Sequence, residues 1–231
     1  MNWTLVILGI ILLIVIYILY KVIKEKGKTV ANKIDLTVTN DKLSMSKLVT
    51  PNSSRYYLMT WIFVEQKVSQ NDTMIKIQQS SDSAKVKLSI DLDTSSTLKY
   101  TISDSDVANT TTHTIMENFP LQKWVCVVLS IDGDVVDIYI DGKMTRSERL
   151  AVKPDAPNKD DEIAYNKINT DTSVIYLAKF EREPKPIDPS LAWNKYMEGH
   201  GGSYFSRLLS NYGASFTVTK DDLDVRTFNL F

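Results

Sequence analysis

The stretch WVCVVLSIDGDVVDIYIDGK at residues 124–143 decides the fold class. Residues 124–131 are apolar almost throughout, so we predict a strand that is buried on both faces. Asp132-Gly133 separates this strand from VVDIYI at 135–140, and Asp141-Gly142 ends the second strand. An Asp-Gly pair between strands favours a hairpin, because the tight turn needs residues that tolerate positive φ. The stretch therefore predicts a three-stranded antiparallel meander.

Other segments extend the β pattern on both sides of this meander. Residues 84–90 and 97–103 alternate apolar and polar side chains, which gives each strand one buried and one solvated face. Residues 58–64 (LMTWIFV) are apolar on both faces and predict a second central strand. We therefore place Trp61 and Trp124 in the core between two sheets. Three further strands are predicted at 173–180, 214–219 and 225–231.

One short helix is expected after the strands, near the C-terminus. Asp188 can N-cap it, Pro189 fits its first turn and Gly199 fits its C-terminal cap. A long polar loop is predicted at 153–171, between the meander and the next strand. Eight to ten short strands with one short helix predict an all-β fold, a β-sandwich or jelly roll.

The N-terminus carries a different pattern. No charged residue occurs from Leu5 to Leu19, and Trp3, Tyr17 and Tyr20 flank this apolar run. The 21 residues 3–23 span about 31 Å as a helix, which matches a bilayer core. We predict a transmembrane helix at 1–23. A cleaved signal peptide is the rival interpretation, but it needs a basic segment before the apolar run and a small-residue cleavage site after it.

The charges that follow the apolar run predict its orientation. Four lysines (Lys21, Lys24, Lys26 and Lys28) follow it and none precedes it, which places the C-terminal domain on the cytosolic side. A single cysteine, Cys126, agrees with a reducing compartment. We interpret the three glycosylation sequons, at Asn52, Asn71 and Asn109, as chance occurrences. The predicted division is a helix at 1–23, a juxtamembrane linker at 24–34 and a β-sandwich domain at 35–231, with a C-terminal extension from about 200.

The overall composition excludes one class of partner. The net charge is −1 and no long basic block occurs beyond the juxtamembrane lysines, which argues against a nucleic-acid-binding surface. A lipid bilayer and neighbouring structural proteins are the expected partners, and a glycan is a further option.

Three segments in order resemble the concanavalin A-like, or laminin G-like, jelly-roll family. They are TWIFVE at 60–65, WVCVVLSIDGDVVDIYIDGK at 124–143 and IYLAKFEREPKPIDPSLAWNKYMEGHG at 175–201. The resemblance covers about residues 55–200 and implies an antiparallel β-sandwich. The fold hosts glucanases, lectins and adhesive modules, so it does not decide the function.

A narrower resemblance adds a specific function. An N-terminal anchor followed by a laminin G-like domain and the tail YGASF at 212–216 looks similar to membrane-associated minor capsid proteins of large DNA viruses. This resemblance implies a non-enzymatic structural protein that tethers an internal virion membrane to the capsid. A membrane-bound, lectin-like carbohydrate-binding module is the first alternative, and a divergent glycosidase is the second.

No catalytic residue is assigned from the sequence. Asp137 and Asp141 are the best pair for a retaining glycosidase, which needs two carboxylates about 5–5.5 Å apart. The family's glucanases instead carry Glu-x-Asp-x-Glu, and Asp141 is explained by its Asp-Gly turn. We interpret Cys126 as a buried, inert thiol.

No metal or cofactor site is assigned either. Acidic pairs that could bind calcium are Asp91 with Asp93 and Asp104 with Asp106, although such pairs at strand ends are more often turn residues. The two histidines, His113 and His200, are too few and too isolated for a zinc site. Aromatic side chains that could stack on a sugar, if exposed, are Tyr56, Tyr57, Trp193 and Tyr204.

Overall fold

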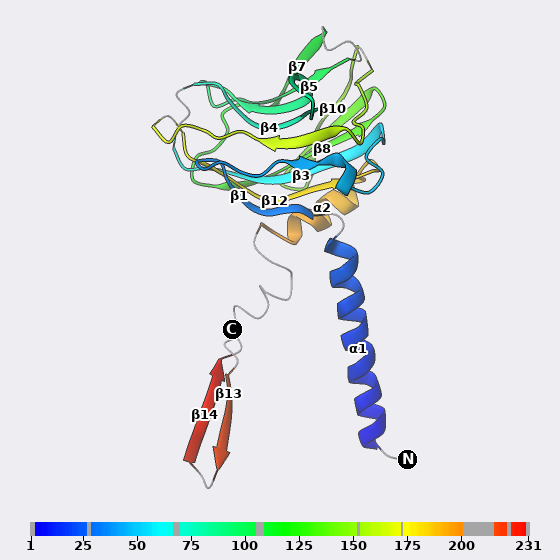
Figure 1. Cartoon of the computed structure of the whole chain (residues 1–231), viewed down its shortest axis with the longest axis vertical. Coiled ribbons are helices and arrows are strands. Elements are labelled where there is room, and N and C mark those ends of the chain that lie inside the picture. The colour runs from blue at the N-terminus through cyan, green and yellow to red at the C-terminus, as the bar shows by residue number, and fades with distance from the viewer. Residues whose placement is uncertain are drawn as a thin grey trace.

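The computed structural model contains two six-stranded antiparallel sheets packed face to face, with helices on one side of the sandwich (Figure 1). It describes residues 3–26, 29–66, 70–104, 109–151, 153–171, 173–200, 215–220 and 223–229. The predicted all-β sandwich is therefore confirmed, in agreement with a jelly roll.

The first sheet, sheet A, has the strand order β1-β12-β3-β8-β9-β10. Its strands are β1 (Thr29–Asp35), β3 (Arg55–Val64), β8 (Trp124–Asp132), β9 (Val135–Ile140), β10 (Lys143–Arg149) and β12 (Ile175–Glu183). The predicted meander is confirmed as β8, β9 and β10. At its second turn Asp141 and Gly142 have φ of 49° and 77°, which is the left-handed conformation that an Asp-Gly pair supplies.

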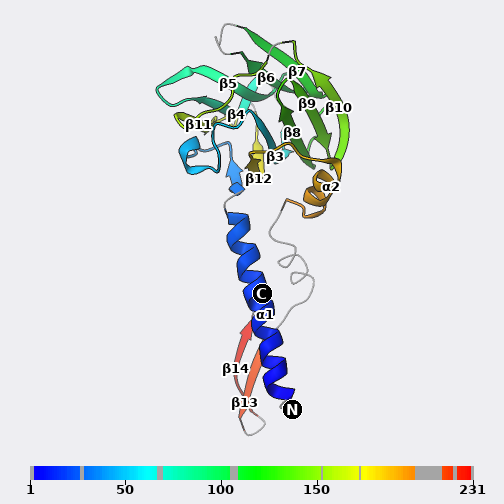
Figure 2. The same ribbon diagram turned by 90° about the vertical axis from the view of Figure 1, so that its right-hand side faces the viewer.

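The second sheet, sheet B, has the order β2-β11-β4-β5-β6-β7. Its strands are β2 (Leu43–Ser44), β4 (Asp72–Gln79), β5 (Asp82–Leu92), β6 (Leu98–Ser103), β7 (Thr110–Met116) and β11 (Asp161–Tyr165). A short 3-10 helix, η1 (Met45–Lys47), follows β2. The sandwich of sheets A and B stands apart from helix α1 (Trp3–Lys26) and from the hairpin of β13 (Ser215–Lys220) and β14 (Leu223–Asn229) (Figure 2).

The predicted helix near the C-terminus is present as α2 (Pro189–Met197). The side chain of Asp188 accepts a hydrogen bond from the backbone N–H of Leu191, as an N-cap does, and Gly199 has φ of 68° just past the helix end. Helix α2 covers the outer face of sheet A, on the side away from sheet B (Figure 1).

The apolar N-terminal stretch is helical, as predicted, from Trp3 to Lys26. Within the part of the chain that the structure describes, no helix is both long enough and apolar enough to cross a membrane, so the transmembrane span is not confirmed. The predicted linker at 24–34 needs a correction, because β1 begins at Thr29 and pairs along β12. Residues in this segment serve as the edge of sheet A and do not form a free tether.

The predicted polar loop at 153–171 also needs a correction. Strand β11 lies inside it and pairs with β4 and β2, and its Ile163 and Tyr165 enter the core. The Lys87 ammonium anchors the segment through two carboxylates, that of Asp155 before β11 at 2.9 Å and that of Asp161, the first residue of β11, at 3.1 Å. The polar composition of 153–171 therefore reflects buried ion pairs as much as solvation.

The two central strands bury both faces, but their tryptophans do not lie between the sheets as predicted. In β3 the residues that face sheet B are Tyr56, Leu58, Ile62 and Val64, and in β8 they are the alternate residues from Val125 to Ile131. Trp61 and Trp124 therefore point to the outer face of sheet A, where a second apolar cluster forms beneath α2. Strand periodicity correctly groups these residues but does not say which face meets the second sheet.

Candidate functional site

Three aromatic residues lie directly opposite one another on neighbouring strands of sheet A. Phe63 of β3 pairs in register with Trp124 of β8 on one side and with Tyr176 of β12 on the other. The ring centroids are 5.3 Å apart for Phe63 and Trp124, and 6.3 Å apart for Phe63 and Tyr176. All three side chains are partly exposed. We call Tyr176, Phe63 and Trp124 the aromatic row.

The rings continue from this row to helix α2. His200 stacks on Trp124 and also contacts the buried Trp61 edge-on, and Tyr196 of α2 stacks on Trp61. Trp193 lies beside Tyr196 and is 43% exposed. The outer face of sheet A therefore carries a continuous series of aromatic rings that lies under α2 at one end and is partly exposed at the aromatic row.

The turn between β9 and β10 fixes α2 against this surface. A Cβ atom at Gly142 would lie 2.9 Å from Cβ of Tyr196 and 3.1 Å from the Trp193 ring, so only glycine allows the helix to come this close. The glycine of the Asp-Gly turn thus has a second role, because it also leaves room for the aromatic side chains of α2.

Charged side chains flank both ends of the aromatic row. The ammonium of Lys33 lies 5.9 Å from the centroid of the Tyr176 ring. Burial raises the pKa of the Tyr176 hydroxyl, and so do the nearby carboxylates of Asp35 and Glu65. At the other end, beside Trp124 in the sequence, Lys123 lies 3.5 Å from the carboxylate of Asp141. Hydrogen-bond donors and acceptors thus border a stacking surface.

Asp137 and Asp141, the candidate glycosidase pair, both form contacts within the protein. The Asp137 carboxylate accepts a hydrogen bond from the hydroxyl of Ser147 at 2.5 Å. The Asp141 carboxylate accepts one from the backbone N–H of Cys126 at 3.0 Å and contacts Lys123. Tyr139, between the two aspartates, is buried. These contacts support the structural interpretation of both residues.

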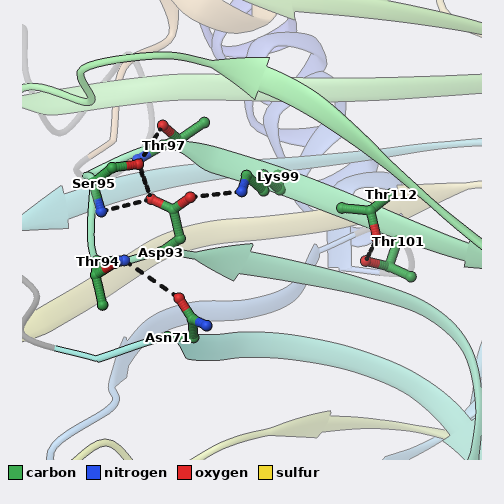
Figure 3. Close-up of polar contacts among 8 residues, drawn as sticks. All are labelled: Asn71, Asp93, Thr94, Ser95, Thr97, Lys99, Thr101 and Thr112. Atoms are coloured by element: carbon green, nitrogen blue, oxygen red, sulfur yellow. Dashed lines mark hydrogen bonds and ion pairs between the residues drawn. The ribbon is translucent and has the colours of Figure 1, made fainter.

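The calcium candidates are engaged within the protein. Figure 3 shows the Asp93 carboxylate turned into its own loop, where it accepts hydrogen bonds from the backbone N–H groups of Ser95 at 2.9 Å and Thr97 at 2.8 Å. The ammonium of Lys99 lies 2.6 Å from its second oxygen. Lys99 and these hydrogen bonds hold the pKa of Asp93 far below its ordinary value, against the opposing effect of burial.

The remaining metal candidates behave in the same way. Asp91 accepts from the Ser89 hydroxyl at 2.6 Å and Asp104 from the Asn109 amide at 2.8 Å, while Asp106 lies outside the described residues. His113 stacks on Tyr100 and lies 3.3 Å from Glu148. Among the residues that the structure describes, no group of three or more His, Cys, Asp or Glu side chains is arranged to hold a metal ion.

The other single residues that the sequence singles out differ in their exposure. Cys126 is fully buried, as predicted, and burial is the main reason that its thiol pKa rises to about 12. Tyr56 and Tyr57 are buried, Trp193 is exposed, and Tyr204 lies outside the described residues. The sequence does not predict the aromatic row, because Phe63 and Tyr176 have the pattern of ordinary strand residues. Its only sequence signal is that all three predicted strands carry an aromatic residue near the same sheet end.

Comparisons with solved structures show the same fold. The binding domain of botulinum neurotoxin DC in complex with rat synaptotagmin II is 15% identical with a TM-score of 0.58, over 74% of this chain and 45% of that chain. The botulinum neurotoxin serotype D ligand binding domain in complex with N-acetylneuraminic acid is 13% identical with a TM-score of 0.57, over 73% of this chain and 42% of that chain. The chain thus spans less than half the length of these structures.

Comparisons of the sequence identify a family. No curated protein sequence matches the chain. One family model, described as the concanavalin A-like lectin/glucanases superfamily, matches residues 37–173, which is more than half of the chain. The match begins after β1 and ends before β12, and it includes all of sheet B and the central strands of sheet A. The chain belongs to the concanavalin A-like lectin/glucanases superfamily.

Proposed function

We propose that this protein is a lectin-like binding module that holds a neutral oligosaccharide on the aromatic row. The observation that carries the proposal is the in-register placement of Tyr176, Phe63 and Trp124 across three strands, with each ring partly exposed. The carbon-bound hydrogens of a sugar ring form an apolar face that packs on an aromatic ring. Two interstrand spacings of about 4.8 Å make the row about 10 Å long, which suits a short oligosaccharide better than a single sugar.

The groups around the row favour a neutral sugar. Asp35 and Glu65 at the Tyr176 end can accept hydrogen bonds from sugar hydroxyls, and Lys33 can donate one. A ligand site of this kind combines an apolar surface with a few polar groups that fix orientation. The same two carboxylates would repel a sugar that carries a carboxylate or sulfate group. We therefore expect neutral glycans to bind more tightly than acidic ones.

Family membership supports a binding function without choosing the ligand. The two neurotoxin domains were solved with N-acetylneuraminic acid and with synaptotagmin II, and those ligands belong to those proteins. We also propose that the protein cleaves no bond in its ligand. Hydrolysis of a β-glucan by the native chain that is lost in Asp137→Asn would contradict this second statement.

The test is a calorimetric titration of the full chain with neutral and with acidic oligosaccharides. Trp124→Ala removes the ring that β8 contributes to the row, so it should weaken binding at least tenfold if the stacking contributes about 1.4 kcal/mol or more. Met144→Ala is the matched control, because Met144 is an exposed apolar residue of β10 outside the row. Equal affinity of the native chain and Trp124→Ala for every sugar that binds would overturn the proposal.

We also propose, as a second function, that the protein tethers a membrane, because helix α1 has an exposed apolar surface. Apolar side chains along α1 are exposed, among them Leu8, Ile10, Leu12, Leu13 and Ile16. An apolar surface of this extent needs a covering of lipid or protein. If lipid covers α1, the protein can have its domain on the cytosolic side and can serve as a minor capsid protein in a virion with an internal membrane. Both proposals depend on this covering. Extraction of the native chain from membranes by alkaline carbonate, without detergent, would contradict the tether.

A further inference from the structure

His200 covers the part of the aromatic row that a ligand would need. Its ring centroid lies 4.6 Å from that of Trp124 and the two ring planes differ by only 13°. The same imidazole meets Trp61 at 5.5 Å with an interplanar angle of 65°. His200 is itself exposed, whereas Trp124 is only partly exposed, so the imidazole lies on the solvent side of the Trp124 indole and covers part of it.

The position of His200 is set by the end of helix α2. Gly199 adopts a φ of 68°, which reverses the chain after the helix and directs the next residue back over sheet A. The helix is held to the sheet by the ion pairs of Lys195 with Glu181, at 2.6 Å, and of Lys179 with Glu198, at 2.5 Å. The attached helix therefore places the His200 ring on Trp124.

We propose that His200 acts as a self-inhibiting cap on the stacking face of Trp124. The inference rests on the function proposed above, because it assigns the cap to that same site. An imidazole in nearly parallel contact with the indole occupies the place where the apolar face of a sugar ring would pack. A ligand then binds only the fraction of molecules in which the cap is open, and its apparent dissociation constant rises by that factor.

The size of this effect follows from the usual strength of aromatic contacts. A stacked pair is worth enough to favour the closed form by about two- to tenfold. Removal of the imidazole should therefore tighten binding of a neutral oligosaccharide by about the same factor. The sign of the change separates a cap from a ligand contact, because loss of a contact would weaken binding.

The first measurement needs no sugar. In a Trp3→Phe/Trp193→Phe background, which leaves the partly exposed Trp124 and the buried Trp61 as emitters, acrylamide quenching reports the access to Trp124. His200→Ala should raise the quenching constant, and the control Asn194→Ala, an exposed residue of α2, should not change it. Unchanged quenching in His200→Ala would overturn the cap.

The second measurement is the titration of His200→Ala with the neutral oligosaccharide that binds the native chain most tightly. Tighter binding by about two- to tenfold, lost again in His200→Ala/Trp124→Ala, supports the cap. Weaker binding would overturn it and assign His200 to ligand contact. If no variant binds any sugar while quenching rises, the proposed function fails and the shielding of Trp124 by His200 stands.

Discussion

Lys195 of α2 and Glu181 of β12 form an ion pair of 2.6 Å in which the side chains are only 11% and 3% exposed. Burial lowers the pKa of Lys195, but the carboxylates of Glu181, Glu198 and Glu183 outweigh it, so the net shift is upward. Because the lysine pKa is raised, the pair stabilises the fold at pH values below the ordinary lysine pKa of about 10.4. This stabilisation is lost as the pH rises through the folded-state pKa of Lys195. The pair therefore attaches α2 to sheet A throughout the neutral range.

Breaking this pair from one side should be costly. Lys195→Met leaves a buried carboxylate without its partner, and we expect a loss of about 3–5 kcal/mol in the free energy of unfolding. The double variant Lys195→Met/Glu181→Met should recover most of the loss, because an apolar pair needs no charge compensation. Urea denaturation of the native chain, Lys195→Met, Glu181→Met and the double variant measures both the loss and its recovery. Equal losses in the single and double variants would contradict an ion pair of this kind.

The two tryptophans of the central strands should differ in their contribution to stability. Trp61 is 5% exposed under Tyr196, so Trp61→Ala should cost about 3–5 kcal/mol. Trp124 is partly exposed on the outer face, and Trp124→Ala should cost only about 1 kcal/mol. Thermal unfolding of the two variants checks the order. A larger loss of stability for Trp124→Ala than for Trp61→Ala would place Trp124 in the core between the sheets, where the sequence alone predicts it.

Cys126 should not react in the folded protein. Its side chain is fully buried, and burial together with Asp141 raises the thiol pKa to about 12, so almost no thiolate exists at neutral pH. Iodoacetamide at pH 8 should leave the native chain unmodified and alkylate it completely in denaturant, as mass spectrometry can show. Rapid alkylation of the native chain would show that the outer face of sheet A opens near β8.

The contacts of Asp93 in the loop that follows β5 should stabilise the fold less at acidic pH. The pKa of Asp93 is lower in the folded state than in the unfolded state. The ionised carboxylate therefore stabilises the fold at pH values above the ordinary aspartate pKa of about 3.9, and this stabilisation is lost as the pH falls from there through the folded-state pKa. Asp93→Asn should remove about 1–3 kcal/mol at pH 7 and flatten the acid limb of the stability curve. Asp160→Asn is the control, since Asp160 is exposed. An unchanged acid limb in Asp93→Asn would contradict this assignment.

Local sequence rules predict the strands and turns of this fold well. Alternation identifies β5 and β6, the Asp-Gly pairs identify the meander, and Asp188 and Gly199 bound α2 correctly. The sequence does not predict strand β11, because Asp155 and Asp160 before it and Asp161 at its first position give the segment the composition of a loop. Only the folded chain shows that Lys87, far away in β5, neutralises Asp155 and Asp161.

The candidate site is harder to predict than the fold. Phe63, Trp124 and Tyr176 come from distant segments, and their meeting depends on the strand order β12-β3-β8 and on the register of both pairings. A register shift of one residue in either pair would turn one ring into the opposite face. The contact of His200 with Trp124 further depends on α2 folding back over sheet A. None of these relationships is local in the sequence.

The most direct test of the account is the indole N–H spectrum of the chain during titration with a neutral oligosaccharide. The chain has 4 tryptophans, so the resonances can be assigned with single Trp→Phe variants. We expect the Trp124 resonance to shift saturably with the sugar, while that of Trp3, in α1, stays in place. Saturable binding that leaves the Trp124 resonance unmoved would contradict the central claim that the aromatic row of sheet A holds the ligand.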